Sequence, residues 1–239
     1  MMLIKSKFTL VEAMVVMALI SILVSLLSPT LRKFSKHAHE VSCSVGVRNL
    51  INVSHAYAED SDGYFPDIQQ HPKNKKDVVG VAFFAFRYWA DLLEQDYGLS
   101  RENWYSPSNP DWSFEMFYQY NKGVHMVMGR TYYGAKALQG MFESTILPTF
   151  KGSPTFAARI IDLPSQNVLW TDINRKLSGT DSFVNPISGG VKNGANHLYD
   201  LNGNWPELSH NGKLDGSVEL AFGEEIKVRF KNIGSVNHW

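Results

Sequence analysis

Residues 8–28 read FTLVEAMVVMALISILVSLLS, and this stretch decides the architecture of the chain. Sixteen of the 21 residues are apolar, and four of the other five are serine or threonine. At about 1.5 Å per residue, a helix of this length spans about 31 Å, close to the ~30 Å hydrocarbon core of a bilayer. The stretch therefore predicts a membrane-spanning helix at the N-terminal end of the chain.

The flanks of this stretch distinguish it from a secretory signal peptide. The head, residues 1–7, reads MMLIKSK and carries two lysines, as an insertion signal does. A secretory signal has a shorter apolar run with a small-residue cleavage site behind it. Here the apolar run continues into Ser-Pro-Thr-Leu-Arg-Lys over residues 28–33. A plain single-span anchor is the simplest interpretation of the composition.

Glu12 is the feature that a plain anchor does not need. A carboxylate at the centre of a membrane span costs about 2.5–3.5 kcal/mol on insertion scales, and less near the end of the span. Such a residue either lies at the headgroups or is kept for a cationic partner that is present in an assembled state.

Residues 7–16, KFTLVEAMVV, followed by an apolar helix and Pro29, resemble the N-terminal processing signal of type IV pilins and type II secretion pseudopilins. In that family a prepilin peptidase cuts before the Phe, and the new amino terminus is methylated. The resemblance implies a cut between Lys7 and Phe8, a methylated Phe8, and a Glu12 carboxylate that pairs with the terminal ammonium of a neighbouring subunit. Lys7 departs from the family pattern, which usually has Gly at this position.

The same resemblance implies a function and a location. The chain is expected to be a structural, non-enzymatic subunit of a pilus-like or pseudopilus fibre, without a cofactor. Its partners would be other pilin or pseudopilin subunits, prepilin peptidase, the inner-membrane assembly platform and the lipid bilayer. The domain after the helix would lie outside the cytoplasm of a bacterium, in the periplasm or beyond.

The apolar pattern continues beyond the predicted span. Apolar residues recur at spacings of 3, 4, 3 and 4, at Leu31, Phe34, Ala38, Val41 and Val45. This spacing predicts an amphipathic helix over 29–60 that packs on the globular domain. Pro29 is expected to kink the helix rather than end it, and the turn-rich residues 60–63 are expected to end it.

The rest of the chain, 61–239, predicts an α+β domain. Tyr88–Tyr97 has apolar residues on one helical face, and several later segments are typical of strands. These strand segments are 126–128, 167–172, 217–222 and 226–230. The expected plan is a leader (1–7), a transmembrane helix (8–28), its amphipathic continuation (29–60) and an antiparallel sheet domain (61–239), arranged as in pilins.

A second, narrower resemblance covers Cys43, residues 57–66 and the C-terminal part of the chain. These segments are similar to pilin-like proteins, numerous in planctomycetes and their relatives, that carry an H-X9-DG element. His197, Asp215 and Gly216 correspond to that element in altered form, since Trp205 rather than His stands ten residues before Asp215. Physically, Asp215-Gly216 predicts a tight hairpin with a positive φ.

Charge and cysteine content exclude several classes of protein. The chain has 23 basic and 23 acidic side chains, so it is not a basic nucleic-acid binder. The first 36 residues hold five basic groups and one acidic group, and the other 203 hold 18 and 22. Its one cysteine excludes an internal disulfide framework, and Cys43 is interpreted as a small buried apolar residue.

Two alternatives remain open from the residues alone. Alternating oxygen side chains make weak calcium candidates of Asp60 and Asp62, and of Asp200 and Asn202, although turns explain both segments. His197 could form a dyad with Asp200 or Asp215, but a hydrogen-bonded histidine beside a turn is the simpler interpretation.

The rival function is a membrane-anchored periplasmic carbohydrate-binding module or hydrolase with a pilin-type anchor. The aromatic content of 13% and the large body motivate it. Core packing and subunit contacts explain the same aromatic residues.

Overall fold

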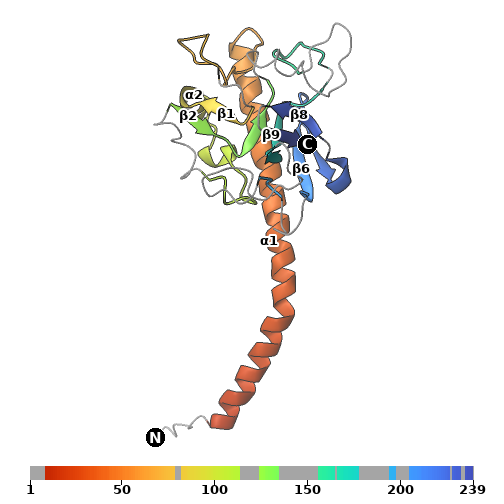
Figure 1. The fold of residues 1–239 in the computed structure, drawn as a ribbon. Helices are drawn as coiled ribbons and strands as arrows, with labels where there is room; N and C mark the ends of the chain where they lie inside the picture. The colour runs from red at the N-terminus through yellow and green to blue at the C-terminus, as the bar shows by residue number, and fades with distance from the viewer. Residues whose placement is uncertain are drawn as a thin grey trace, which may run out of the picture. The chain divides into compact units, whose positions relative to one another are not determined.

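The structure is a computed structural model that describes residues 9–78, 82–113, 124–134, 156–164, 166–177, 194–197, 205–226, 228–232 and 235–238 (Figure 1). The chain forms two compact units, residues 1–41 and 42–239. Lys7, Phe8, Asp200 and Asn202 lie outside the described residues.

A single helix, α1 (Leu10–Asp60), contains 51 residues and continues through Pro29 without interruption. The expected continuation past the proline is therefore confirmed, and the expected kink stays a prediction. The hydroxyls of Ser21, Ser25 and Ser28 donate to carbonyls of the preceding turn, Met17, Ile22 and Val24, at 2.7–2.8 Å. These bonds satisfy the three serine hydroxyls within the helix itself.

The end of α1 follows from the turn residues after it. Ser61 and Gly63 both donate their backbone N–H to the Ala58 carbonyl, at 3.2 and 2.9 Å. Asp62 and Gly63 have positive φ values of 53° and 80°, the left-handed conformation that terminates helices. The helix thus ends where the sequence predicts.

Within the second unit, one face of α1 is buried at helical spacing. The buried residues are Cys43, Gly46, Val47, Leu50, Ile51, Ser54 and Ala58. Val45, from the apolar stripe expected to pack on the domain, is instead 52% exposed, and Leu31, Phe34 and Val41 are exposed as well. Within this unit, the face that packs on the domain is therefore a second apolar stripe with the same period, which begins at Cys43 and includes Leu50 and Ile51.

The second unit is an α+β structure with antiparallel sheets, as predicted. Its four-stranded sheet has the order β3-β4-β6-β7 and consists of β3 (Arg130–Tyr132), β4 (Trp170–Asp172), β6 (Leu208–Gly212) and β7 (Val218–Phe222). A three-stranded sheet consists of β5 (Arg175–Leu177), β9 (Ser235–His238) and β8 (Val228–Asn232). Strands in or beside 126–128, 167–172, 217–222 and 226–230 confirm the sequence-based expectations.

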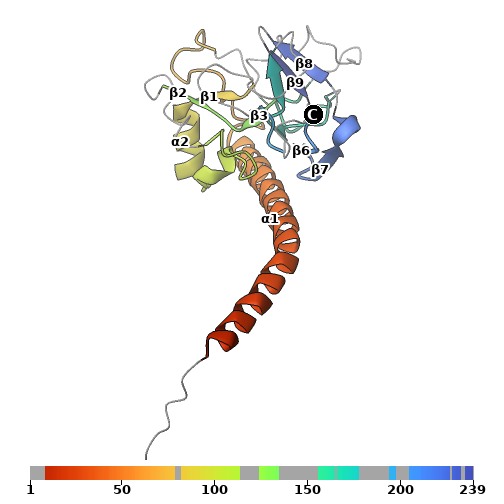
Figure 2. The same cartoon turned by 60° about the horizontal axis from the view of Figure 1, so that its bottom comes forward.

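A smaller group of elements precedes these sheets in the chain. It consists of β1 (Phe84–Phe86), α2 (Arg87–Gln95), the 3-10 helix η1 (Arg101–Trp104) and β2 (His125–Val127), with β1 paired to β2. The 3-10 helix η4 (Gly223–Glu225) follows β7. In both ribbon views, α2 with β1 and β2 lies on one side of the C-terminal part of α1, and β6–β9 lie on the other (Figures 1 and 2).

The sheet packs closely on the buried face of α1. A Cβ added at Gly212 of β6 would lie 2.6 Å from Ile51 Cδ1 and 2.8 Å from Val47 Cγ1, so no side chain fits there without displacement. Trp170 of β4 donates its Nε1–H to Ser54 Oγ at 3.0 Å, and its ring centroid lies 4.4 Å from that of Tyr132. These contacts fix the helix against the four-stranded sheet.

Candidate functional site

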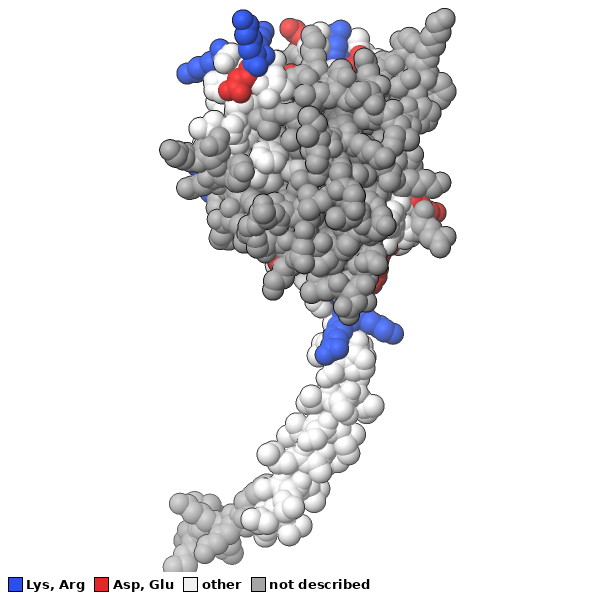
Figure 3. All heavy atoms as spheres, in the orientation of Figure 1, with Lys and Arg blue, Asp and Glu red and all other residues white. Residues whose placement is uncertain are grey.

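The N-terminal half of α1 presents an uncharged apolar surface. Residues 13–31 contain no Asp, Glu, Lys or Arg, and this part of the helix is white in the charge-coloured view (Figure 3). Its large apolar side chains are exposed, from Leu10 (77%) to Leu31 (63%). Among the described residues, α1 is the one helix long and apolar enough to cross a membrane.

The apolar surface is bordered by one acidic group and several basic groups. Glu12 accepts hydrogen bonds at Oε2 from the backbone N–H and the hydroxyl of Thr9, at 2.8 and 2.9 Å. Thr9 Oγ1 in turn accepts the N–H of Glu12 at 3.2 Å. This reciprocal arrangement is a capping box, which places the carboxylate at the positive end of the helix dipole. At the other end, the basic residues are Arg32, Lys33 and Lys36.

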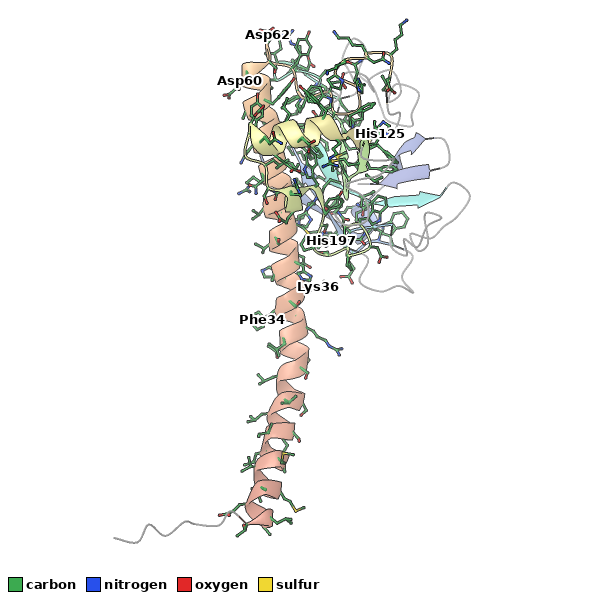
Figure 4. All side chains as sticks on the ribbon, turned by 90° about the vertical axis from the view of Figure 1, so that its left-hand side faces the viewer. Phe34, Lys36, Asp60, Asp62, His125 and His197 are labelled. Atoms are coloured by element: carbon green, nitrogen blue, oxygen red, sulfur yellow. The ribbon has the colours of Figure 1, made fainter. Side chains whose placement is uncertain are left out.

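The weak calcium candidates are engaged in other contacts. Asp60 and Asp62 lie at the end of α1 (Figure 4). Asp60 Oδ2 accepts a hydrogen bond from the Tyr97 hydroxyl at 3.2 Å, and the Asp62 carbonyl accepts one from Arg159 Nη2 at 3.2 Å. The calcium hypothesis gains no support from these contacts, and its other pair lies outside the described residues.

The hairpin prediction at Asp215-Gly216 is confirmed. β6 and β7 pair in antiparallel register around a turn in which Gly216 has φ +84°. Asp215 Oδ1 accepts the backbone N–H of Ser217 at 2.9 Å and its hydroxyl at 2.6 Å. Asp215 is exposed and shapes the turn, whereas the carboxylate that lies beside His197 among the described residues is Asp172.

Asp172, the last residue of β4, is the centre of a buried polar cluster. Its Oδ1 accepts hydrogen bonds from Arg130 Nη1 and, at 2.8 Å, from Asn196 Nδ2. Its Oδ2 accepts the backbone N–H of His210 at 2.9 Å and lies 2.7 Å from His210 Nδ1 and 3.2 Å from His197 Nε2. Each of these side chains is at most 1% exposed. The carboxylate therefore faces donors on both oxygens.

The charges of this cluster reinforce one another. Burial raises the pKa of Asp172, but the charges of Arg130, His210 and His197 outweigh burial and hold the pKa well below its usual range. Burial lowers the pKa of His197, but the Asp172 charge and hydrogen bonds to Asp172 and Cys43 raise it to about 9. His197 is therefore an imidazolium near neutral pH, next to a permanent carboxylate.

Cys43 of α1 joins the cluster through His197. Burial raises the pKa of the thiol, whereas the hydrogen bond to His197 and the charge of Arg130 lower it, with a net value of about 7. Cys43 Sγ lies 2.8 Å from Ser106 Oγ and 3.4 Å from Ser108 Oγ, and its carbonyl accepts a hydrogen bond from Arg130 Nη2 at 3.3 Å. The burial expected for Cys43 is confirmed, but its surroundings are polar.

A cavity of about 530 Å³ lies beside Cys43. Its lining residues are Ser42, Gly46, Glu102, Asn103, Tyr105, Ser106, Pro107, Asn109, Pro110, Trp112 and Ser113. Two of them separate it from the cluster: Ser106, which touches the sulfur, and Gly46, where an added Cβ would lie 3.2 Å from Arg130 Nη2. The part of the lining formed by Ser106 and Gly46 is thus close to both the Cys43 sulfur and the Arg130 guanidinium.

Sequence reasoning singled out His197 but missed Arg130, Asp172 and His210 as its neighbours. The signal that could have indicated them is a charged residue at the end of an apolar strand, as in Val-Leu-Trp-Thr-Asp over residues 168–172. Such a residue faces burial and therefore needs a partner. The partners come from distant parts of the chain, which no local pattern connects.

No family model, curated protein or solved structure matches this chain. The resemblance to pilins accordingly rests on the N-terminal residues themselves.

Proposed function

We propose that this protein is a membrane-anchored structural subunit of a pilin-like fibre, either a type IV pilus-like filament or a type II secretion pseudopilus. Prepilin peptidase processes it before Phe8, and it assembles through the N-terminal half of α1. The observation that carries the proposal is the continuous, exposed, uncharged helix surface over residues 13–31 with Glu12 at its N-terminal end.

The exposed apolar surface of α1 is expected to be buried against lipid or against another protein. Fully burying one leucine, valine or methionine side chain stabilises a protein by about 1.5–3 kcal/mol relative to leaving it in water. A contiguous apolar surface of this length on a soluble protein marks a membrane or protein contact. Lipid tails cover such a helix before assembly, and the same helices of neighbouring subunits cover it in a fibre.

Glu12 favours a fibre subunit over a plain anchor. A cut before Phe8 leaves a terminal ammonium four residues from this carboxylate in the same chain, and an equivalent ammonium on every neighbouring copy. Two opposite charges that are each expensive in lipid become tolerable when they pair. The pairing then favours the assembled state over the isolated subunit.

Mass spectrometry of the protein isolated from its native membrane tests the proposal. We expect a mature chain that begins at Phe8 and carries a methyl group on its amino terminus. A chain that keeps Met1, or that begins at another residue, would overturn the processing step and with it the assembly mode.

A further inference from the structure

The sulfur of Cys43 lies among groups that donate hydrogen bonds. Ser106 Oγ, at 2.8 Å, itself accepts the backbone N–H of Ser108 at 3.2 Å, so the Ser106 hydroxyl hydrogen is free to point at the sulfur. The Ser108 hydroxyl lies 3.4 Å away, and the His197 ring is a further hydrogen-bond partner. An environment of donors stabilises a sulfur anion and does not favour a neutral thiol.

Cys43, His197 and Asp172 form a chain of interacting groups like that of an activated nucleophile. His197 is a hydrogen-bond partner of Cys43, and its Nε2 lies 3.2 Å from Asp172 Oδ2. A nucleophile beside a histidine that a third group orients is the arrangement that activates cysteine for attack. The Arg130 guanidinium, which binds both Asp172 and the Cys43 carbonyl, adds a second positive charge close to the sulfur.

Access to the sulfur is restricted by size. Cys43 is fully buried, and Ser106 lies between it and the cavity of about 530 Å³. A protein thiol has no direct access to a fully buried sulfur. A small molecule that enters the cavity is separated from the sulfur by the Ser106 hydroxyl, which lies 2.8 Å from Cys43 Sγ.

We propose that Cys43 is a nucleophilic thiolate and a modification site for small electrophiles, with a hydroperoxide such as hydrogen peroxide as its oxidant. The sulfur attacks one peroxide oxygen, an S–O bond forms and the O–O bond breaks. The leaving hydroxide takes the proton of the His197 imidazolium and becomes water. The products are a cysteine sulfenic acid, a neutral imidazole and one water, and the sulfur loses the two electrons that the peroxide gains.

The sequence restricts the fate of the oxidised sulfur. Cys43 is the one cysteine in the chain, so no second thiol of this protein can convert the sulfenic acid to an internal disulfide. The surrounding donors that stabilise the thiolate also suit the sulfenate oxygen. The oxidised form is therefore expected to persist until a small external thiol reduces it.

A metal centre is the competing use of these residues. One ligand atom each from Asp172, His197 and His210 lie within 4.8 Å of one another. However, Asp172 already accepts hydrogen bonds from Arg130 and Asn196 on one oxygen and from His210 on the other. A divalent cation there would face the Arg130 guanidinium and break existing hydrogen bonds, so the observations favour the thiolate.

The test uses the full chain in detergent micelles, with iodoacetamide as the electrophile and intact-mass detection. We expect the alkylation rate of the native protein to level off a little above pH 7, where an ordinary thiol with a pKa of about 8.5 is still gaining reactivity. Hydrogen peroxide should add one oxygen atom to Cys43, and alkylation beforehand should block this addition. A rate that keeps rising like that of an ordinary thiol, or reaction only in denaturant, would overturn the proposal.

Variants separate the roles of the neighbouring groups. His197→Gln should move the rate profile toward that of an ordinary thiol and slow alkylation at pH 7 by about fivefold or more, since a midpoint at least one pH unit higher leaves about a tenth of the sulfur ionised instead of about half. Ser106→Ala removes one donor while leaving the histidine, and should raise the midpoint by less. His37→Gln, whose ring is 75% exposed on the helix, is the matched control and should leave the profile unchanged.

If His197→Gln fails to fold, the wild-type and Ser106→Ala profiles still decide the question. Elemental analysis of the same preparation tests the competing metal site. Stoichiometric zinc that protects Cys43 until a chelator removes it would replace the thiolate by a metal site and overturn the proposal. None of these outcomes depends on fibre assembly.

Discussion

The Asp172 carboxylate lies 2.7 Å from His210 Nδ1 and accepts the His210 backbone N–H at 2.9 Å through the same oxygen. With Arg130 on the other oxygen, this one side chain ties β3, β4 and β6 together. Because Arg130 also binds the Cys43 carbonyl, the same network reaches α1. A buried charge with partners on this many elements is expected to be important for the stability of the domain.

Asp172→Asn should therefore strongly destabilise the second unit. The substitution leaves the Arg130 guanidinium buried without a compensating charge, and breaking a buried ion pair from one side costs about 3–5 kcal/mol. Chemical denaturation of the full chain in detergent, followed by tryptophan fluorescence, measures the change in the free energy of unfolding.

Asp91→Asn is the matched control, because Asp91 pairs with Arg87 at 3.7 Å on the surface of α2 and is 41% exposed. Exposed pairs of this kind contribute about 0–1 kcal/mol. Equal effects of the two substitutions would contradict a special role for the buried carboxylate.

The stability of the domain should fall at alkaline pH because of His197. Its pKa is raised from about 6.5 in the unfolded chain to about 9, so the folded state binds more protons between these values. The stabilisation is fully present below about pH 6.5 and is lost as the pH rises through about 9, and its size is on the order of 3–4 kcal/mol.

The Cys43 thiol affects the stability of the domain with the opposite pH dependence. Its pKa is lowered to about 7, so its contribution is present above about pH 8.5 and is lost as the pH falls through about 7. Between about pH 7 and pH 8.5, the stability lost through His197 is offset by the stability gained through Cys43. The net loss of stability should therefore be clear above about pH 8.5. Denaturant midpoints of wild type and His197→Gln across this range measure the effect, and equal alkaline slopes would show that His197 does not cause it.

Gly212→Ala should weaken the contact between β6 and α1. The new methyl group would lie 2.6 Å from Ile51 Cδ1, and overpacking a core in this way costs about 1–3 kcal/mol. Ile51→Val deletes the clashing Cδ1 atom, so the double variant should recover part of the loss relative to the sum of the two single variants. Strict additivity in the denaturation measurements would mean that the two residues do not interact.

The sequence predicts the local elements well and the contacts between them poorly. The continuous helix through Pro29, its end near Asp60 and the turn at Gly216 follow from residue types that act within a few positions. The packing face of α1 could not be chosen in this way, because the stripes beginning at Leu31 and at Cys43 both satisfy the helical period. A choice between them depends on which sheet residues are opposite, and Gly212 provides this information only in three dimensions.

The buried cluster was unpredictable for a related reason. Cys43, Arg130, Asp172, His197 and His210 come from α1, β3, β4, the 194–197 segment and β6. Each residue alone has an ordinary explanation, such as a small buried thiol or a surface charge. Their chemistry arises from desolvation and from mutual contacts, which depend on strand order and register.

The last prediction concerns Glu12 and separates its charge from its role as a cap. Glu12→Gln keeps a side-chain oxygen that can accept the Thr9 hydrogen bonds, since glutamine also serves at this position of a capping box. It removes the negative charge that would pair with the terminal ammonium of a neighbouring subunit. We expect normal membrane insertion but at least a tenfold loss of incorporation into sheared fibres, measured by immunoblotting of membrane and fibre fractions.

Two further variants complete this experiment. Glu12→Ala loses both the charge and the cap and should incorporate no better than Glu12→Gln. Glu40→Gln, on the same helix beyond the apolar segment and 3.5 Å from His37, is the matched control and should incorporate normally. If Glu12→Gln assembles like wild type while Glu12→Ala does not, the carboxylate acts as a helix cap, and the charge-pairing step of the proposed assembly is wrong.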